Sequence, residues 1–213
     1  MLDSRGHHLA SVCSYGGKRI ATHDGMKYEF NNILRYCGLH TKMEERGAFQ
    51  ELDPNNNMRP DISVFNPTFT TAPKQLLDIA VTGTLTGFNT NGHQLQNIGS
   101  SAQHMYNNKI NHYAPHVIPN RFSFLPIIFE SSGYMHADVK DLLLKVATLA
   151  SDIKRIPKQV LYKYFLKRLS LCLQCGVAYA INSRILSLNS HCDGMKHDAS
   201  YHRNIVLDSH VKC

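Results

Sequence analysis

Two short apolar segments each carry one aspartate, and this pattern limits what the chain can fold into. Asp61 stands near the start of residues 58–65, and Asp78 stands inside residues 75–82. Apolar runs of this length, rich in β-branched residues, are typical of buried strands. Burying an unpaired carboxylate is unfavourable, so each aspartate should have a cation, a hydrogen-bond donor or a metal beside it.

Neighbouring strands of one sheet could bring the two carboxylates to the same place. Like charges about 4 Å apart repel by about 4 kcal/mol at an effective dielectric of about 20. A divalent cation between them removes this repulsion, and Mg²⁺ prefers one or two carboxylates with water and phosphate oxygens. The pair therefore predicts a metal-dependent phosphodiesterase site. The alternative interpretation is two strand-end carboxylates at a solvated sheet edge.

The charge balance favours an anionic partner. The 213 residues include 23 Lys and Arg against 16 Asp and Glu, a formal net charge of +7. Such a balance favours nucleic acid over a membrane as the partner. The sequence shows no apolar signal segment, and no apolar run approaches the roughly 20 residues that span a bilayer. We therefore expect an intracellular protein whose six cysteines are thiols or metal ligands rather than disulfides.

The periodicity of the sequence predicts a mixed α/β domain. Helical spacing of apolar residues predicts four helices, at residues 23–39, 96–113, 138–150 and 157–188. Apolar runs and alternation predict four strands, at residues 42–50, 58–65, 75–82 and 122–129. Pro126 places the last strand at a sheet edge or a bulge, and Pro115 is expected to end the second helix.

Residues 1–20 carry a weaker pattern that concerns zinc. His8 and Cys13 have four residues between them, as in half of a zinc knuckle, and Zn²⁺ takes four nitrogen or sulfur ligands. The alternative interpretation is a start that binds no metal. The tail at residues 189–213 also contains His and Cys, and its polar, aperiodic composition predicts a flexible segment. A zinc-binding structural module is therefore one hypothesis for function.

Four short strings occur in a recognisable order: GGKRIATHD at residues 16–24, RPD at 59–61, LDIAV at 77–81 and KINHY at 109–113. Together they resemble the restriction-like endonuclease region of site-specific non-long-terminal-repeat retrotransposon proteins. Residues 124–133 and 169–180 are similar to downstream parts of related reverse-transcriptase-associated sequences. The resemblance covers most of residues 6–188.

The resemblance implies a PD-(D/E)XK-like αβββαβ core with a C-terminal helical extension. It divides the chain into four parts: a zinc-knuckle remnant at residues 1–20, a nuclease-like domain at 21–150, a helical extension at 151–188 and the tail at 189–213. The reverse transcriptase region of such proteins lies upstream, so we expect this chain to be the downstream part of a retroelement protein.

The implied function is a nuclear DNA endonuclease that nicks one strand, so that the freed 3′ hydroxyl primes reverse transcription. Under this resemblance Asp61 and Asp78 would hold Mg²⁺ or Mn²⁺, with the backbone carbonyl of Ile79 as a further ligand. Lys109 would steady the nucleophile or the developing charge. DNA is the expected partner, and RNA is a second one.

Two positions depart from the family pattern. The lysine expected two residues after Asp78 is Ala80 here, and the family's second lysine on the following helix is His112. Lys109 could bring its ammonium to the same place from that helix, or it could be an ordinary exposed lysine. A second hypothesis therefore stays open, in which a catalytically decayed nuclease-fold module binds nucleic acid without cutting it.

Overall fold

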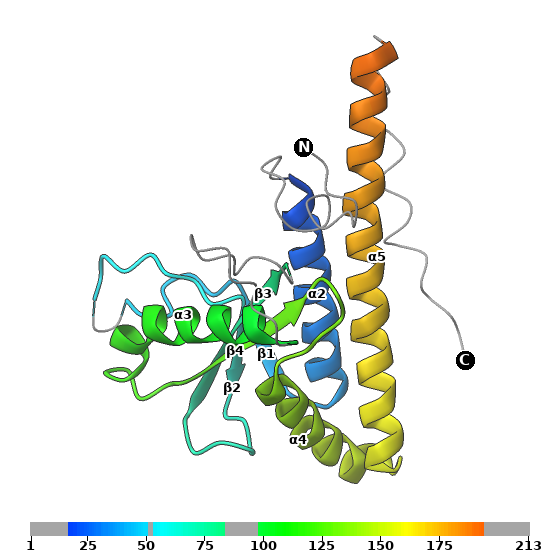
Figure 1. Ribbon diagram of the computed structural model, residues 1–213. Coiled ribbons are helices and arrows are strands. Elements are labelled where there is room, and N and C mark those ends of the chain that lie inside the picture. Colours follow the sequence, from blue (N-terminus) through cyan, green and yellow to red (C-terminus); the bar gives the residue numbers. More distant parts are fainter. Residues whose placement is uncertain (1–16, 51–52, 84–97, 194–213) are drawn as a thin grey trace.

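A computed structural model describes residues 17–50, 53–83 and 98–193 of the chain. Their secondary structure comprises four helices and four strands (Figure 1). In chain order these are α2 (Gly17–Tyr36), β1 (His40–Met43), β2 (Ile62–Phe65), β3 (Lys74–Thr82), α3 (Ser100–Val117), β4 (Ser123–Glu130), α4 (Ala137–Lys154) and α5 (Lys158–Asp193). This order confirms the predicted αβββαβ core followed by C-terminal helices.

The four strands form one mixed sheet in the order β1-β2-β3-β4. The β1–β2 and β2–β3 pairs are antiparallel, whereas β3 and β4 are parallel and are joined through α3. Pro126 lies on β4, which is an edge strand, as predicted for a residue that cannot donate to a second ladder. The strand β3 is therefore internal, and most of its side chains are buried.

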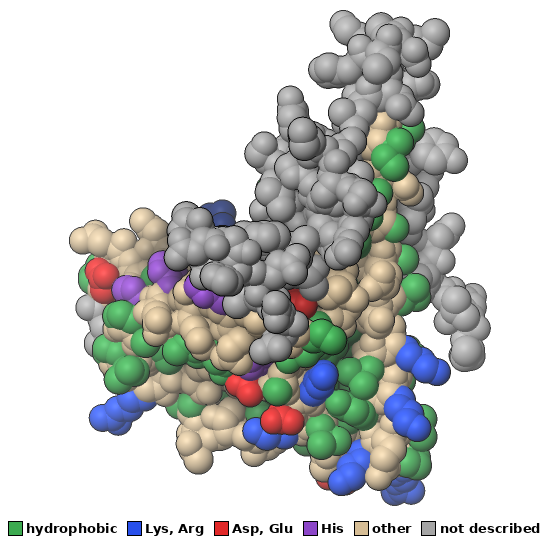
Figure 2. Space-filling model, in the orientation of Figure 1, with side chains coloured by type: hydrophobic (Ala, Val, Ile, Leu, Met, Phe, Trp, Pro, Cys, Tyr) green, Lys and Arg blue, Asp and Glu red, His purple; other side chains and the backbone are tan. Residues whose placement is uncertain are grey.

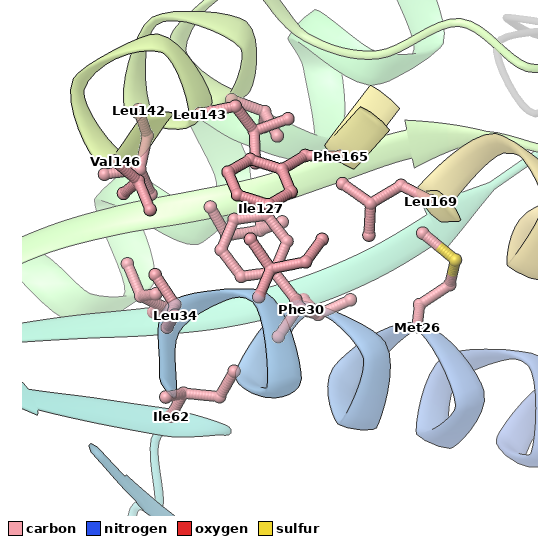
Figure 3. Packing of buried hydrophobic residues seen from close by; sticks show 14 of the residues in the cluster. Met26, Phe30, Leu34, Ile62, Ile127, Leu142, Leu143, Val146, Phe165 and Leu169 are labelled. Carbon is pink, nitrogen blue, oxygen red and sulfur yellow. The ribbon is translucent and has the colours of Figure 1, made fainter. Parts of the chain in front are cut away.

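The larger core lies between one face of the sheet and the helices α2, α4 and α5. The residues at helical spacing that predicted an apolar face are all buried there, four in α2 and one directly after it: Met26, Phe30, Ile33, Leu34 and Cys37. Phe165 and Leu169 of α5 reach the same core, where they pack near Phe30 and Ile127 (Figure 3). The first half of α5 thus belongs to the hydrophobic core of the α/β unit.

A smaller core lies under α3 on the opposite face of the sheet. It joins Leu76 of β3 and Tyr113 of α3 to Phe49 from the β1–β2 connection. The ring of Tyr113 stacks on Phe124 of β4 with the ring centroids 4.2 Å apart. This packing fixes α3 across the sheet, so the residues of its inner face have defined positions over β3.

Two local predictions are wrong. The strand expected at residues 42–50 ends at Met43, because Glu44 and Gly47 have positive φ and the chain turns there to bury Phe49 under α3. Pro115 does not end its helix, which continues to Val117. A proline in the last turn removes only one backbone donor, and the Ile118 amide still donates to the Ala114 carbonyl.

No helix in the described ranges is both long and apolar enough to cross a membrane. Cys37, Cys172 and Cys175, the cysteines whose side chains the structure describes, are free thiols.

A matched pair of isoleucines on α2 tests this packing. Ile33 is 1% exposed and Ile20 is 59% exposed. We expect Ile33→Ala to lower the free energy of unfolding by about 2–5 kcal/mol, because it removes buried apolar atoms and leaves a cavity. Ile20→Ala should change it by less than about 0.5 kcal/mol. Urea unfolding followed by circular dichroism measures both, and equal effects would contradict the described position of α2.

Candidate active site

The two predicted aspartates meet at one end of the β2–β3 ladder. The last pair of that ladder is Ile62 with Leu77. Asp61 comes immediately before Ile62 and Asp78 immediately after Leu77, so the two residues oppose one another at the next position of an antiparallel pair. The side chains are 14% and 8% exposed, respectively. The structure therefore brings these two predicted site residues together.

The side chain of Asp61 contacts β3 at the end of the ladder. Its Oδ2 accepts a hydrogen bond of 2.7 Å from the backbone amide of Ile79. The same oxygen lies 3.1 Å from Nε2 of His23, which comes from α2. The hydrogen bond with Asp61 raises the pKa of His23 above its ordinary value, although burial opposes this. Sequence analysis did not assign a role to His23.

Asp78 is held from the other face of the sheet by α3. The ammonium of Lys109 forms an ion pair with Oδ2 of Asp78, and the Tyr113 hydroxyl donates to Oδ1 at 3.2 Å. Burial raises the pKa of Asp78, as does the negative charge of Asp61, while Lys109 and Tyr113 oppose the rise. The pKa of Tyr113 is raised by its own burial and by Asp78, so its hydroxyl stays a donor at neutral pH.

Lys109 lies over the face of the sheet to which the side chain at position 80 also points. Ala80 is two residues after Asp78 on β3, so the two side chains lie on the same face of the sheet. A lysine at position 80 would extend over the face that α3 covers. Lys109 reaches Asp78 from that helix instead. Lys109 thus forms an ion pair with one of the two aspartates, and its catalytic role stays a prediction.

Charged side chains from α2, β1 and the following loop surround this site. Lys27, of which only 4% is exposed, donates to Asp24 at 2.9 Å and also binds Glu44. Glu44 in turn lies 3.8 Å from Arg59, two residues before Asp61. These pairs join the start of α2 to the segment that leads into β2. They therefore help to set where His23 stands relative to Asp61.

The donor groups at this site suit Mg²⁺ better than zinc. Two carboxylates stand side by side, and no donor within the described ranges reaches Oδ1 of Asp61. The carbonyl of Ile79 points to the same side of β3 as its amide, which is the side of Asp61. No group of three or more His, Cys, Asp or Glu in the described residues could hold a metal alone. Mg²⁺ needs fewer protein ligands, because it keeps several waters.

Other predicted or considered residues lie elsewhere. His8, Cys13 and residues 194–213 of the predicted tail are outside the described residues. The tail was predicted to begin at residue 189, and this is wrong, because residues 189–193 belong to α5. Glu29 of α2 forms an ion pair with Arg168 of α5 and takes no part in the site.

The residues that sequence reasoning missed are His23 and the hydroxyl of Tyr113. The contact of His23 with Asp61 joins positions 38 residues apart, and that of Tyr113 with Asp78 joins positions 35 apart. Periodicity marks Tyr113 only as an apolar helix position and says nothing of His23. The sole signal for either residue was its presence in the strings GGKRIATHD and KINHY.

No protein-family model and no curated protein matches this sequence.

The buried carboxylate of Asp78 gives a prediction about stability and pH. Its pKa is higher in the folded protein than in the unfolded chain, so the stability that it contributes is complete at low pH and is lost as pH rises through the folded pKa. Asp78→Asn removes this loss. We expect the variant to be more stable than the parent by about 1 kcal/mol at neutral pH.

The gain should shrink when unfolding is repeated at lower pH, because a growing fraction of the parent carboxylate is then protonated. Asp141→Asn, at an exposed position of α4, serves as the control and should show no such trend. A loss of stability in Asp78→Asn that grows toward neutral pH would show that Lys109 outweighs burial at this site.

Proposed function

We propose that this chain is a Mg²⁺-dependent DNA endonuclease of the PD-(D/E)XK-like type, which nicks one strand for target-primed reverse transcription in a retroelement. One observation carries the proposal: Asp61 and Asp78 oppose one another at the end of β2 and β3, with the ammonium of Lys109 on Asp78. The αβββαβ order of the elements supports it.

In this proposal Asp61, Asp78 and the Ile79 carbonyl hold the metal. Bound Mg²⁺ or Mn²⁺ would lower the pKa of a water molecule and polarise the scissile phosphate. Lys109 carries the positive charge that steadies the nucleophile or the charge that develops on the phosphate. Tyr113 keeps Asp78 oriented through its hydroxyl and also contacts the Arg59 carbonyl at 3.4 Å.

The surface charge supports DNA as the substrate. Helix α3, which provides Lys109, contains no acidic residue. Its exposed face is made of carboxamides and imidazoles that can bond to phosphates and bases: Gln103, His104, Asn107, Asn108, Asn111 and His112. A DNA substrate would place the protein in the nucleus.

A basic surface lies along the first half of α5, where lysine and arginine side chains gather at the lower right of Figure 2. Lys158, Lys163 and Lys167 are exposed there. Arg168 is bound to Glu29 and is therefore less available to a phosphate. Exposed lysines on one helix can follow a phosphate backbone.

The decayed binding module remains a second candidate function, because Ala80 replaces the lysine of the standard motif. In that case Lys109 would only neutralise Asp78, and the basic surface would still bind DNA. The two candidates differ in cleavage, not in binding.

A plasmid-nicking assay separates them. With Mg²⁺ or Mn²⁺ the parent protein should convert supercoiled plasmid to the open circle. Asp61→Asn should reduce nicking to background, because it removes a charged metal ligand, and Lys109→Gln should slow nicking by about 100-fold. Lys145→Gln, at an exposed position of α4, is the charge-matched control and should nick like the parent. A folded, DNA-bound parent that does not nick would establish the binding module instead.

Salt dependence tests the basic surface of α5. Each phosphate contact made by a lysine adds about one unit to the slope of log affinity against log salt, so Lys163→Gln with Lys167→Gln should lower the slope by about 2. The matched control is Lys140→Gln with Lys145→Gln on α4, where both residues are exposed. Fluorescence anisotropy with a labelled duplex measures the slopes. Equal losses in the two double variants would mean that overall charge, rather than this surface, determines binding.

A further inference from the structure

Among the described residues, Asp61 has two donors on one carboxylate oxygen and none on the other. Oδ2 is bound by the Ile79 amide at 2.7 Å and by Nε2 of His23 at 3.1 Å, while no described donor reaches Oδ1. The two donors come from different elements, since Ile79 lies on β3 and His23 on α2. A carboxylate with this pattern presents its second oxygen in one direction.

The backbone around Asp61 does not fix that direction by itself. Asp61 lies in a bend before β2, follows Pro60, and joins its neighbour strand only through its carbonyl, which accepts from the Glu44 amide at 2.9 Å. With the Ile79 amide as its only side-chain partner, the carboxylate could still turn about that hydrogen bond. A second donor from another direction removes this freedom.

The imidazole of His23 is itself held in place. Its Nδ1 lies 3.3 Å from Oδ1 of Asp24, and Asp24 is bound by the nearly buried Lys27. Three residues after His23, Met26 enters the main core, where it lies beside Leu169 and Phe30 (Figure 3). The ring thus has a carboxylate at each nitrogen and stands on a helix whose position the core determines.

We infer that His23 is a positioning residue, which orients the Asp61 carboxylate so that Oδ1 faces the metal position between Asp61 and Asp78. This inference rests on the proposed function, because it assigns His23 a role toward the same metal. With this role α2 becomes part of the site, which the proposed function otherwise builds from Asp61, Asp78 and Lys109. Partners that orient metal ligands in this way typically change metal affinity or activity by about 10- to 100-fold when they are removed.

The experiment compares His23→Ala with His23→Gln, which retains a hydrogen-bond donor, and with His40→Ala as a control. His40 is an exposed histidine of β1 whose ring lies against Phe65. The first readout is the NMR shift of the Ile79 amide proton, which reports the hydrogen bond to Asp61 without any metal. The second is Mn²⁺ binding to the protein without DNA, measured by water-proton relaxation.

We expect His23→Ala to move the Ile79 amide shift toward its value in Asp61→Ala and to weaken Mn²⁺ binding by about 10-fold or more. His23→Gln should restore most of both properties, and His40→Ala should match the parent. A purely structural role for His23 would alter the melting temperature but leave the Ile79 shift and Mn²⁺ affinity of the folded variant unchanged.

Parental Ile79 shift and parental Mn²⁺ affinity in folded His23→Ala would overturn the inference and leave the proposed nuclease intact. A shifted Ile79 amide in His23→Ala, in a protein whose parent neither binds Mn²⁺ nor nicks plasmid, would overturn the nuclease while showing that His23 orients Asp61. If His23→Ala does not fold, the same two readouts are made on His23→Gln. Loss of the hydrogen bond between the Ile79 amide and Asp61 in that variant would contradict the inference, because glutamine retains a donor at position 23.

Discussion

The electrostatic compensation of Asp61 and Asp78 is the interaction on which the rest of the site depends. Two carboxylates at opposed positions of neighbouring strands repel, and Asp78 is buried as well, which disfavours its charged form. Each carboxylate is bound by side chains from a different helix. Helix α3 supplies Lys109 and Tyr113 to Asp78, whereas α2 supplies His23 to Asp61. The site therefore requires both helices to be packed correctly on their own faces of the sheet.

This requirement explains why the two cores matter for the site. The large core fixes α2 through residues such as Phe30, and the small core fixes α3 through Tyr113, whose ring packs while its hydroxyl binds Asp78. Tyr113 therefore has a packing role and a polar role in one side chain. Burial disfavours the charged form of Asp78. The fold tolerates this local cost because the surrounding packing stabilises it as a whole.

The sequence predicted the parts of the fold that depend on local pattern. The alternation and density of apolar residues located β3 closely, and helical spacing identified the buried face of α2. Asp61 and Asp78 were found because a carboxylate in an apolar run is physically anomalous. The prediction of a strand beyond Met43 is wrong. The alternation there is weak, and the positive φ angles of Glu44 and Gly47 turn the chain instead. His23 could not be found from pattern, because its partner is defined only once α2 is packed.

The placement of Lys109 shows why such a site can tolerate Ala80. An ammonium beside Asp78 offsets the charge of this buried carboxylate, and a lysine on another element can supply it if that element is held rigidly over the same face of the sheet. Helix α3 meets this condition, because its inner face packs on β3 and β4. The same reasoning applies to Asp61, where a histidine from α2 provides the second donor that the ladder, ending at Ile62 and Leu77, cannot provide. In both cases the strands supply the carboxylates, and the helices supply the groups that make two neighbouring carboxylates compatible with a folded chain.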